Sequence, residues 1–143
     1  MSRYYLFNSN ATHRENQKKM MLREKYISAQ YSAKEKVDLV DRGDIIFIYE
    51  NRVGIVACGI ADGRLIAREY EGWEDEEHLM HLNEYQKVSP PYRPEAISKL
   101  SRELTSTGVF FARTLSPLRP EVGDVIYRQI KERSSKGNPR TAT

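Results

Sequence analysis

The sequence is poor in cysteine, with Cys58 as the only one among 143 residues. A single cysteine forms neither an internal disulfide nor a cluster of thiolate metal ligands, so both are excluded as sources of stability or chemistry. Cys58 lies in the apolar run Gly54-Ile55-Val56-Ala57-Cys58. We therefore interpret it as an inert core residue rather than a nucleophile.

Long apolar runs are also missing. No stretch approaches the ~20 consecutive apolar residues that a membrane-spanning helix needs. The first five residues, MSRYY, lack the apolar region of a signal peptide. We predict a cytoplasmic protein that makes no contact with a membrane.

The familiar signatures of catalysis are absent as well. The sequence has no glycine-rich phosphate loop of Walker type, no Gly-x-Ser-x-Gly motif and no assignable Ser-His-Asp order. His78 and His81 are three residues apart, a spacing that would place both on one face of a helix, but a zinc site needs a third ligand. We predict no catalytic residue, no metal and no cofactor, and the sequence does not support an enzymatic activity.

What is present indicates one domain. The chain is close to the usual length of a single hydrophobic core, and 39% of its residues are hydrophobic. We assign residues 1–133 to the domain and the polar residues 134–143 to a disordered tail. Strands are predicted at 3–7, 44–49, 53–61, 64–68, 84–88 and 109–113, and helices at 14–25, 33–40, 94–104 and 120–133. Residues 26–32 are expected to be irregular, and an acidic loop is expected around Trp73.

The central segment suggests how the strands are arranged. Asp62-Gly63 predicts a type I′ turn, which would join 53–61 and 64–68 into a meander with 44–49. The four residues at 45–48 are all apolar, so this strand should be covered on both faces, as in a small barrel. Gly54 and Gly59 would permit the bends that closure requires. The predicted fold class is α+β, with a small β-barrel of about five to six strands and two to four flanking helices.

Charge is distributed unevenly along the chain, whose formal net charge is +3. Basic residues crowd both ends, and if the ends lie close together they form one face suited to phosphates. A solvated surface of mixed charge is the alternative. The candidate phosphate-binding residues are Arg14, Lys18, Lys19, Arg23 and Lys25. The opposing acidic block comprises Glu69, Glu71, Glu74, Asp75, Glu76 and Glu77.

Two segments resemble a known family. Residues 4–10, YYLFNSN, resemble the opening strand and polar loop of EVE domains, and residues 41–61 are similar to the central hairpin of that family. The order of elements is similar to the PUA-like superfold, which also contains the YTH and ASCH branches. This chain differs in its Asn8-Ser9-Asn10 loop, which is acidic in typical EVE domains, and it lacks the tryptophan near the crossing segment unless Tyr26 or Tyr31 replaces it.

The resemblance implies a PUA-like barrel and a nucleic-acid-binding module that holds an extruded base, modified or not, between the first strand and the barrel. An extruded base is held by stacking on aromatic rings and by hydrogen bonds to its edge. The candidate pocket residues are Asn8, Ser9, Asn10, Tyr26, Ser28, Tyr31, Tyr49, Asn51 and Trp73. A purely structural role in the core remains the alternative for each aromatic residue.

Two other functions stay open at this point. The ASCH branch includes hydrolases, so the resemblance also allows a small hydrolase of nucleoside-like or amide substrates. An accessory module that contacts another protein through the acidic segment 71–77 is the third possibility. The predicted partner is a nucleic acid, DNA or RNA, with a protein partner as the alternative.

Overall fold

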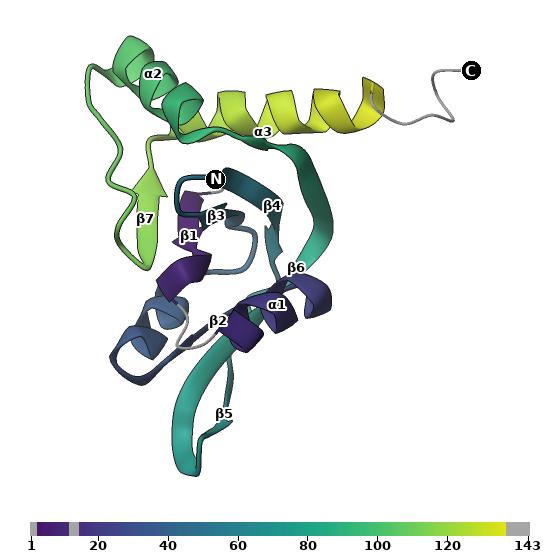
Figure 1. Ribbon diagram of the computed structural model, residues 1–143, viewed down its shortest axis with the longest axis vertical. Helices are drawn as coiled ribbons and strands as arrows, with labels where there is room; N and C mark the ends of the chain where they lie inside the picture. Colours follow the sequence, from purple (N-terminus) through teal and green to yellow (C-terminus); the bar gives the residue numbers. More distant parts are fainter. Residues whose placement is uncertain (1–2, 12–14, 137–143) are drawn as a thin grey trace.

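A single curled sheet forms the body of the protein (Figure 1). The computed structural model describes residues 3–11 and 15–136 of the chain. The seven strands are β1 (Tyr4–Asn8), β2 (Tyr26–Gln30), β3 (Ile45–Glu50), β4 (Gly54–Ala61), β5 (Ile66–Tyr70), β6 (Trp73–Tyr92) and β7 (Leu115–Leu118). The helices are α1 (Glu15–Glu24), α2 (Pro94–Thr105) and α3 (Pro120–Lys136), with 3₁₀ turns η1 (Ser9–Ala11) and η2 (Tyr31–Leu39).

The long strand β6 gives the sheet its curvature. The strand order is β2-β6-β4-β3-β1-β7, and β5 pairs with β6 beside this path. The first half of β6 lies between β2 and β5, whereas its second half pairs with β4. Among the strand pairs of the described residues, only β1 and β3 run parallel. The result is a curled half-barrel, which confirms the predicted α+β fold class.

The two faces of the sheet carry separate cores. Along β3, Ile46 and Ile48 contact the core that contains Met21 of α1. Phe47 points to the other face and contacts the core that contains Ile126 of α3. This alternation confirms that β3 is covered on both sides, as its unbroken apolar sequence predicted.

Helices α1 and α3 therefore lie on opposite faces of the sheet, as Figure 1 shows. The basic residues near the two ends of the chain consequently do not merge into one face. The prediction of a joint basic face is wrong, and the positive charge of α1 acts without that of α3.

Two glycines allow β4 to follow the curve between its neighbours. A Cβ on Gly54 would lie 2.1 Å from the carbonyl oxygen of Tyr92, and the φ angle of Gly54 is +119°. A Cβ on Gly59 would lie 2.8 Å from the Cβ of Leu82, next to an irregularity in the β4–β6 register. Close strand approach at both positions requires the absence of a side chain.

Several local predictions fail because tertiary pairing decides them. Residues 26–30 form β2 rather than an irregular segment, since β6 supplies their partners. The acidic segment after Trp73 is the start of β6 rather than a loop. β5 pairs with β6 and not with β4, so the predicted meander is wrong. At the predicted type I′ turn, Gly63 has a positive φ but Asp62 does not, and the Asp62 carboxylate instead accepts the Arg64 amide at 2.9 Å.

The C-terminal half follows the predicted helices closely. α2 begins at Pro94 and ends at Thr105, and the left-handed backbone of Ser106 caps it. Strand β7 starts at Leu115, two residues after the predicted strand at 109–113 ends. α3 continues to Lys136, and positions 137–143 lie outside the described residues. None of the helices in the described part of the chain combines the length and the apolar character needed to cross a bilayer.

Candidate functional site

The polar loop after β1 forms a closed network with the end of β3. The Asn8 side chain donates to Asn51 Oδ1 at 3.0 Å and to the Phe111 carbonyl at 2.9 Å. Ser9 Oγ donates to the Tyr49 carbonyl at 3.0 Å, and Asn10 Oδ1 accepts the Asn51 amide at 2.7 Å. Asn8 and Ser9 are buried. The fold thus brings five predicted pocket residues together, but it directs their polar groups toward one another.

The ring of Tyr49 is also packed inside the protein. It is 3% exposed and stacks on Phe111 with 4.8 Å between ring centroids and 11° between planes. Such a pair stabilises the loop beyond the burial of its area. Within this network Tyr49 acts as a core aromatic, and the ring offers no face for another stacking partner.

A second polar cluster crosses three strands at the other end of the sheet. Gln30 on β2, Glu77 on β6 and Arg68 on β5 are register neighbours, so their side chains lie in one row. Gln30 Nε2 donates to Glu77 Oε2 at 2.9 Å, and Arg68 Nε donates to Glu77 Oε1. Glu77 is 2% exposed. A buried carboxylate is tolerated here because both of its oxygens have donors.

Two predicted pocket residues, Tyr26 and Ser28, form hydrogen bonds to this row. The Tyr26 hydroxyl accepts from Arg68 Nη2 at 3.2 Å, and the guanidinium lies 5.6 Å from the centre of the Tyr26 ring. Ser28 Oγ accepts from Gln30 Nε2 at 3.4 Å. Both residues are buried on β2. Tyr26 and Ser28 therefore hold the polar row in position, and they are not themselves exposed to solvent.

An open cleft of about 430 Å³ lies directly over this row, between α1 and the β5–β6 hairpin. Its lining residues are Asn16, Gln17, Met20, Arg68, Glu69, Tyr70, Glu71 and Glu77. Gln17 Oε1 is buried and has no hydrogen-bond partner among the described residues. A buried carbonyl without a partner costs about 1–3 kcal/mol, so a hydrogen-bond donor brought to this oxygen would be stabilising.

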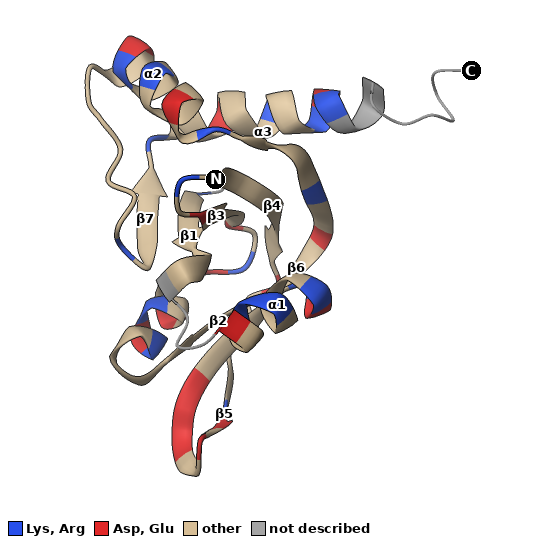
Figure 2. Ribbon diagram, in the orientation of Figure 1, with Lys and Arg blue, Asp and Glu red and all other residues tan. Residues whose placement is uncertain are grey.

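The end of the hairpin holds the remaining two predicted aromatics. The Tyr31 hydroxyl donates to a Glu71 carboxylate oxygen, and the Tyr31 ring packs edge-on against Tyr70 at 5.5 Å. Trp73 is 66% exposed, which is high for the largest apolar side chain. Figure 2 shows that this end of the molecule is predominantly acidic. Trp73 therefore stands apart from the other predicted pocket residues.

The opposite side of α1 presents a basic groove, which we define by its lining residues. They are Lys19, Leu22, Arg23, Val56, Tyr85 and Lys87, around a space of about 400 Å³. The floor is apolar, and the three charged side chains are exposed at its rim. Lys25 joins them, with its ammonium group 5.9 Å from the centre of the Tyr85 ring. No ion pair to an acidic residue is found for Lys19, Lys25 or Lys87 in the described part of the chain.

The predicted phosphate-binding residues thus separate into two groups. Lys19, Arg23 and Lys25 lie at the basic groove. Lys18 faces away from it: its side chain is 12% exposed, and its ammonium group lies 3.0 Å from Glu50 Oε1. The charge of Lys18 is therefore compensated within the protein. Arg14 lies outside the described residues.

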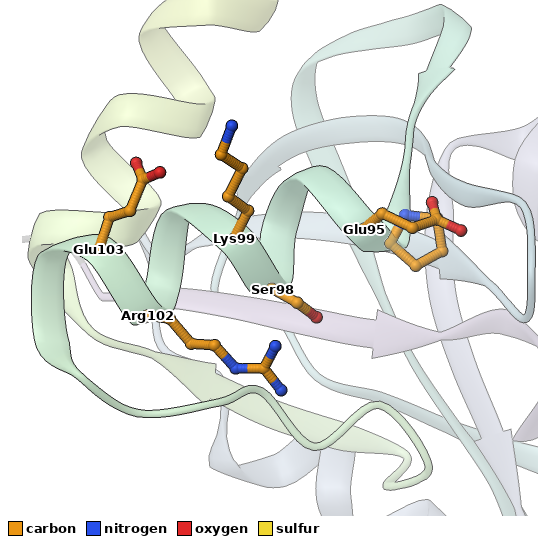
Figure 3. A pocket seen from close by; sticks show the side chains of 6 residues that line it. Glu95, Ser98, Lys99, Arg102 and Glu103 are labelled. Carbon is orange, nitrogen blue, oxygen red and sulfur yellow. The ribbon is translucent and has the colours of Figure 1, made fainter.

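The space beside α2 is a weaker candidate. It encloses about 470 Å³, and its lining residues are Pro94, Glu95, Ser98, Lys99, Arg102 and Glu103. Figure 3 shows that the labelled side chains all project from one helix, with Lys99 and Glu103 on one side of it and Ser98 and Arg102 on the other. Acidic and basic groups are mixed there, and all the lining residues belong to that helix. This surface therefore lacks the convergent polar groups of a binding site.

The paired histidines do not form a metal site. His78 and His81 lie on strand β6, so the helical spacing that sequence suggested does not apply. His78 Nδ1 lies 2.6 Å from Asp38 Oδ1, and Nε2 lies 2.8 Å from Asp75 Oδ1. Burial lowers the pKa of His78, but the hydrogen bonds to Asp38 and Asp75 outweigh it and the pKa is raised. The His78 ring is thereby committed to joining η2 to β6.

Cys58 lies buried beneath the opposite face of the sheet. Burial raises the pKa of its thiol to about 11, so the reactive thiolate is scarce at neutral pH. This environment agrees with an inert core residue.

Most residues that line the two sites were not predicted as site residues from the sequence. Tyr85 and Lys87 lie on β6 and face α1, whereas Gln17, Arg68 and Glu77 meet only because three strands and a helix converge. For Lys87 and Tyr85 a signal existed, since they alternate with buried Val88 in a strand that was correctly placed. For the other three the sequence contains no such signal.

Known proteins were compared with this chain in sequence and in structure. No family model and no curated protein sequence matches it. A hypothetical protein from Leishmania major shares the fold with a TM-score of 0.61 at 12% identity, over 94% of this chain and 98% of that one. Human THYN1, in complex with DNA containing 5-methylcytosine, gives 0.56 at 11% identity, over 91% and 98%. The YTH domain of Mmi1, in complex with RNA, gives 0.58 at 10% identity, over 94% and 81%.

At these identities the similarity establishes the fold alone. It confirms the PUA-like architecture and its resemblance to the EVE and YTH branches.

Proposed function

We propose that this protein is a nucleic-acid-binding module that holds phosphates along the basic groove and an extruded base in the polar cleft on the other side of α1. The observation that carries the proposal is the placement of two complementary sites on the two sides of one helix. Two proteins of the same fold, THYN1 and the Mmi1 YTH domain, form complexes with DNA and RNA. That shared fold supports a nucleic acid as the ligand class.

The basic groove suits a single strand. Lys19 and Lys87 are exposed around an apolar floor, so their charges remain available to phosphates. Arg23 is exposed beside them, with its Nε 3.4 Å from Glu24 Oε1. The half-buried ring of Tyr85 lies on that floor, and base–aromatic stacking is worth about 1–3 kcal/mol. Phosphate contacts supply affinity without sequence preference, while the ring supplies a platform for one base.

The polar cleft suits the edge of a base. Its volume lies within the range of about 300–1,000 Å³ that small-ligand sites occupy. Arg68 and Glu77 provide a donor and an acceptor in a fixed row, and Gln17 adds an unpaired amide. These groups would repay the few kcal/mol that base extrusion costs. A chemically modified base would enter the same open cleft.

The test is a titration of fluorescent 10-nucleotide DNA and RNA strands at two salt concentrations. We expect affinity to fall steeply with salt, and each phosphate contact on a single strand to contribute about 0.7 to the slope of log K against log salt. The double variant Lys19→Ala/Lys87→Ala should lower the slope by about 1.4.

Lys99→Ala is the matched control, because Lys99 is an exposed lysine on α2, away from both sites. Its slope should equal that of the unmodified protein. Binding that is absent, or that does not respond to salt, would reject the proposal.

A second candidate function is docking of a protein partner at the hairpin end. The specific observation is the 66% exposure of Trp73 among acidic residues, since exposed tryptophans often anchor interfaces. A basic partner would suit that charge. If Trp73→Ala abolishes co-purification with a partner but leaves oligonucleotide affinity unchanged, this second function is supported beside the first.

A further inference from the structure

We infer that the polar cleft selects guanine over the other bases. This inference rests on the proposed function, since it names the base that the same cleft would take. It follows from the number and order of donors and acceptors around the cleft, and from the negative charge at its rim.

Acceptors dominate the walls of the cleft. Both oxygens of Glu77 already accept one hydrogen bond, from Arg68 and Gln30, but each carboxylate oxygen has two acceptor sites. Gln17 Oε1 has no partner among the described residues. A ligand that pairs with this wall would present N–H donors, and it would reach Glu77 through the small part of that side chain, 2%, that is exposed.

The donor in the cleft is the Arg68 guanidinium. Its Nε donates to Glu77 and its Nη2 donates to the Tyr26 hydroxyl, which leaves further N–H groups of the same fork for a ligand. Arg68 is half exposed, with 42% of its side chain accessible, so these groups can be reached. The cleft thus offers a carboxylate and a guanidinium side by side.

Guanine matches this arrangement better than the other bases. Its Watson–Crick edge presents two adjacent donors, N1–H and the N2 amino group, followed by the O6 acceptor. Carboxylates accept two adjacent N–H groups, and arginine is the preferred partner of guanine O6. Adenine and cytosine each have one exocyclic amino group beside a ring acceptor, which would face the carboxylate unpaired. Uracil and thymine present two carbonyl acceptors on either side of one N–H.

Charge at the rim determines which part of the strand enters. Among the described residues that line the cleft, Glu69, Glu71 and Glu77 are acidic and Arg68 is basic. A phosphate would be repelled there, whereas the basic groove on the other side of α1 attracts it. The strand would therefore keep its backbone at the groove and insert only a neutral base into the cleft.

The experiment uses the full chain and 11-nucleotide strands of thymidine with one central position varied. Guanine at that position should bind about tenfold tighter than thymine or cytosine, which corresponds to one good paired contact. Hypoxanthine lacks only the N2 amino group, and 2-aminopurine lacks both O6 and the N1 proton, so each should lose most of this gain. Equal affinity for all strands, with salt-dependent binding retained, overturns the guanine inference and leaves the proposed function standing. Absence of salt-dependent binding overturns both.

Variants separate recognition from folding. Glu77→Gln replaces an acceptor pair by an amide and should remove the guanine preference, but Glu77 is buried and the change can disturb the fold. Gln17→Leu is therefore the second variant. It removes an unpaired buried carbonyl, so the melting temperature should rise while the preference for guanine falls.

Lys19→Ala is the control, because Lys19 lies at the groove and not in the cleft. It should weaken all strands by the same factor. A Gln17→Leu variant that keeps the full guanine preference, together with a Glu77→Gln variant that is folded and keeps it too, overturns the inference.

Discussion

The two sides of α1 differ in how their charged side chains are exposed and paired. On one side, the basic groove exposes lysines that have no acidic partner in the described part of the chain, above an apolar floor. On the other side, the polar cleft buries a carboxylate whose two oxygens are both hydrogen-bonded. Exposed charges remain hydrated and act at long range, whereas buried ones act only through matched geometry.

Because of this difference, the basic groove can supply affinity and the polar cleft can supply selectivity. Charges of the groove are free to neutralise phosphates of any sequence. Groups of the cleft are held by Tyr26 and Gln30, so they present a fixed order of donors and acceptors with which only a matching ligand can pair. The contrast predicts that damage to the cleft is felt in folding as well as in binding, and damage to the groove in binding alone.

The largest effect is expected from Arg68→Ala, which leaves Glu77 as an uncompensated buried carboxylate. We expect a loss of about 2 kcal/mol of stability, less than the ~3–5 kcal/mol of a fully buried pair because Arg68 is half exposed. Urea unfolding monitored by circular dichroism measures it. Arg64→Ala removes an exposed arginine just before β5 and should change stability by less than about 0.5 kcal/mol. An equal loss of stability in the two variants would contradict the contrast between buried and exposed charges.

Tyr85→Leu addresses the groove. Leucine keeps an apolar floor but removes the stacking ring, so single-strand affinity should fall by about 1–2 kcal/mol, roughly five- to thirtyfold. The salt slope should not change, because no charge is removed. Stability is expected to fall less than affinity. If the salt slope changes with the affinity, Tyr85 is acting on the placement of the lysines instead of stacking.

The His78 contacts join η2 to the hairpin that carries the cleft, and their strength depends on pH. Because the folded-state pKa of His78 is raised, its contribution to stability is complete below the unfolded pKa of about 6.5 and is lost as pH rises through the folded value. The melting temperature should therefore decline over that range. His78→Gln should flatten the decline. We expect a smaller effect than for Arg68→Ala, because Asp38 and Asp75 remain partly exposed to water.

The smallest effect is expected from Trp73→Ala at the end of the hairpin. With 66% of the side chain exposed, stability should change by less than about 0.5 kcal/mol. Thermal unfolding measures it. A larger loss would show that Trp73 packs against the hairpin in solution and would remove it as a docking anchor.

Much of the fold could be predicted because local signals and tertiary structure agree. The strand at Ile45–Glu50 and the amphipathic helix Pro94–Thr105 both occur where their patterns indicate. The helix predicted at 120–133 occurs as Pro120–Lys136 although it contains Gly123, and the structure explains that residue: a Cβ there would lie 2.2 Å from Tyr4 Cγ. The glycine weakens the helix locally and permits it to pack on β1.

The candidate site could be predicted less well. Asn8, Ser9 and Tyr49 do lie together, but their hydrogen bonds close the loop instead of lining an opening. The cleft depends on Arg68 and Glu77, and Glu77 falls in a segment that resembles an acidic loop in sequence. A charged residue in a run of charged residues gives no sign that it is 2% exposed.

The sequence by itself determined the fold class, the helices and the buried central strand, because apolar periodicity records which face of each element is covered. It also placed Lys19 and Arg23 on a helix. Only the tertiary structure decided that β6 runs for twenty residues between β2, β5 and β4, since its pairing partners are far away in the chain. That pairing sets Gln30, Glu77 and Arg68 in one row and α1 across it, and the cleft exists because of this convergence.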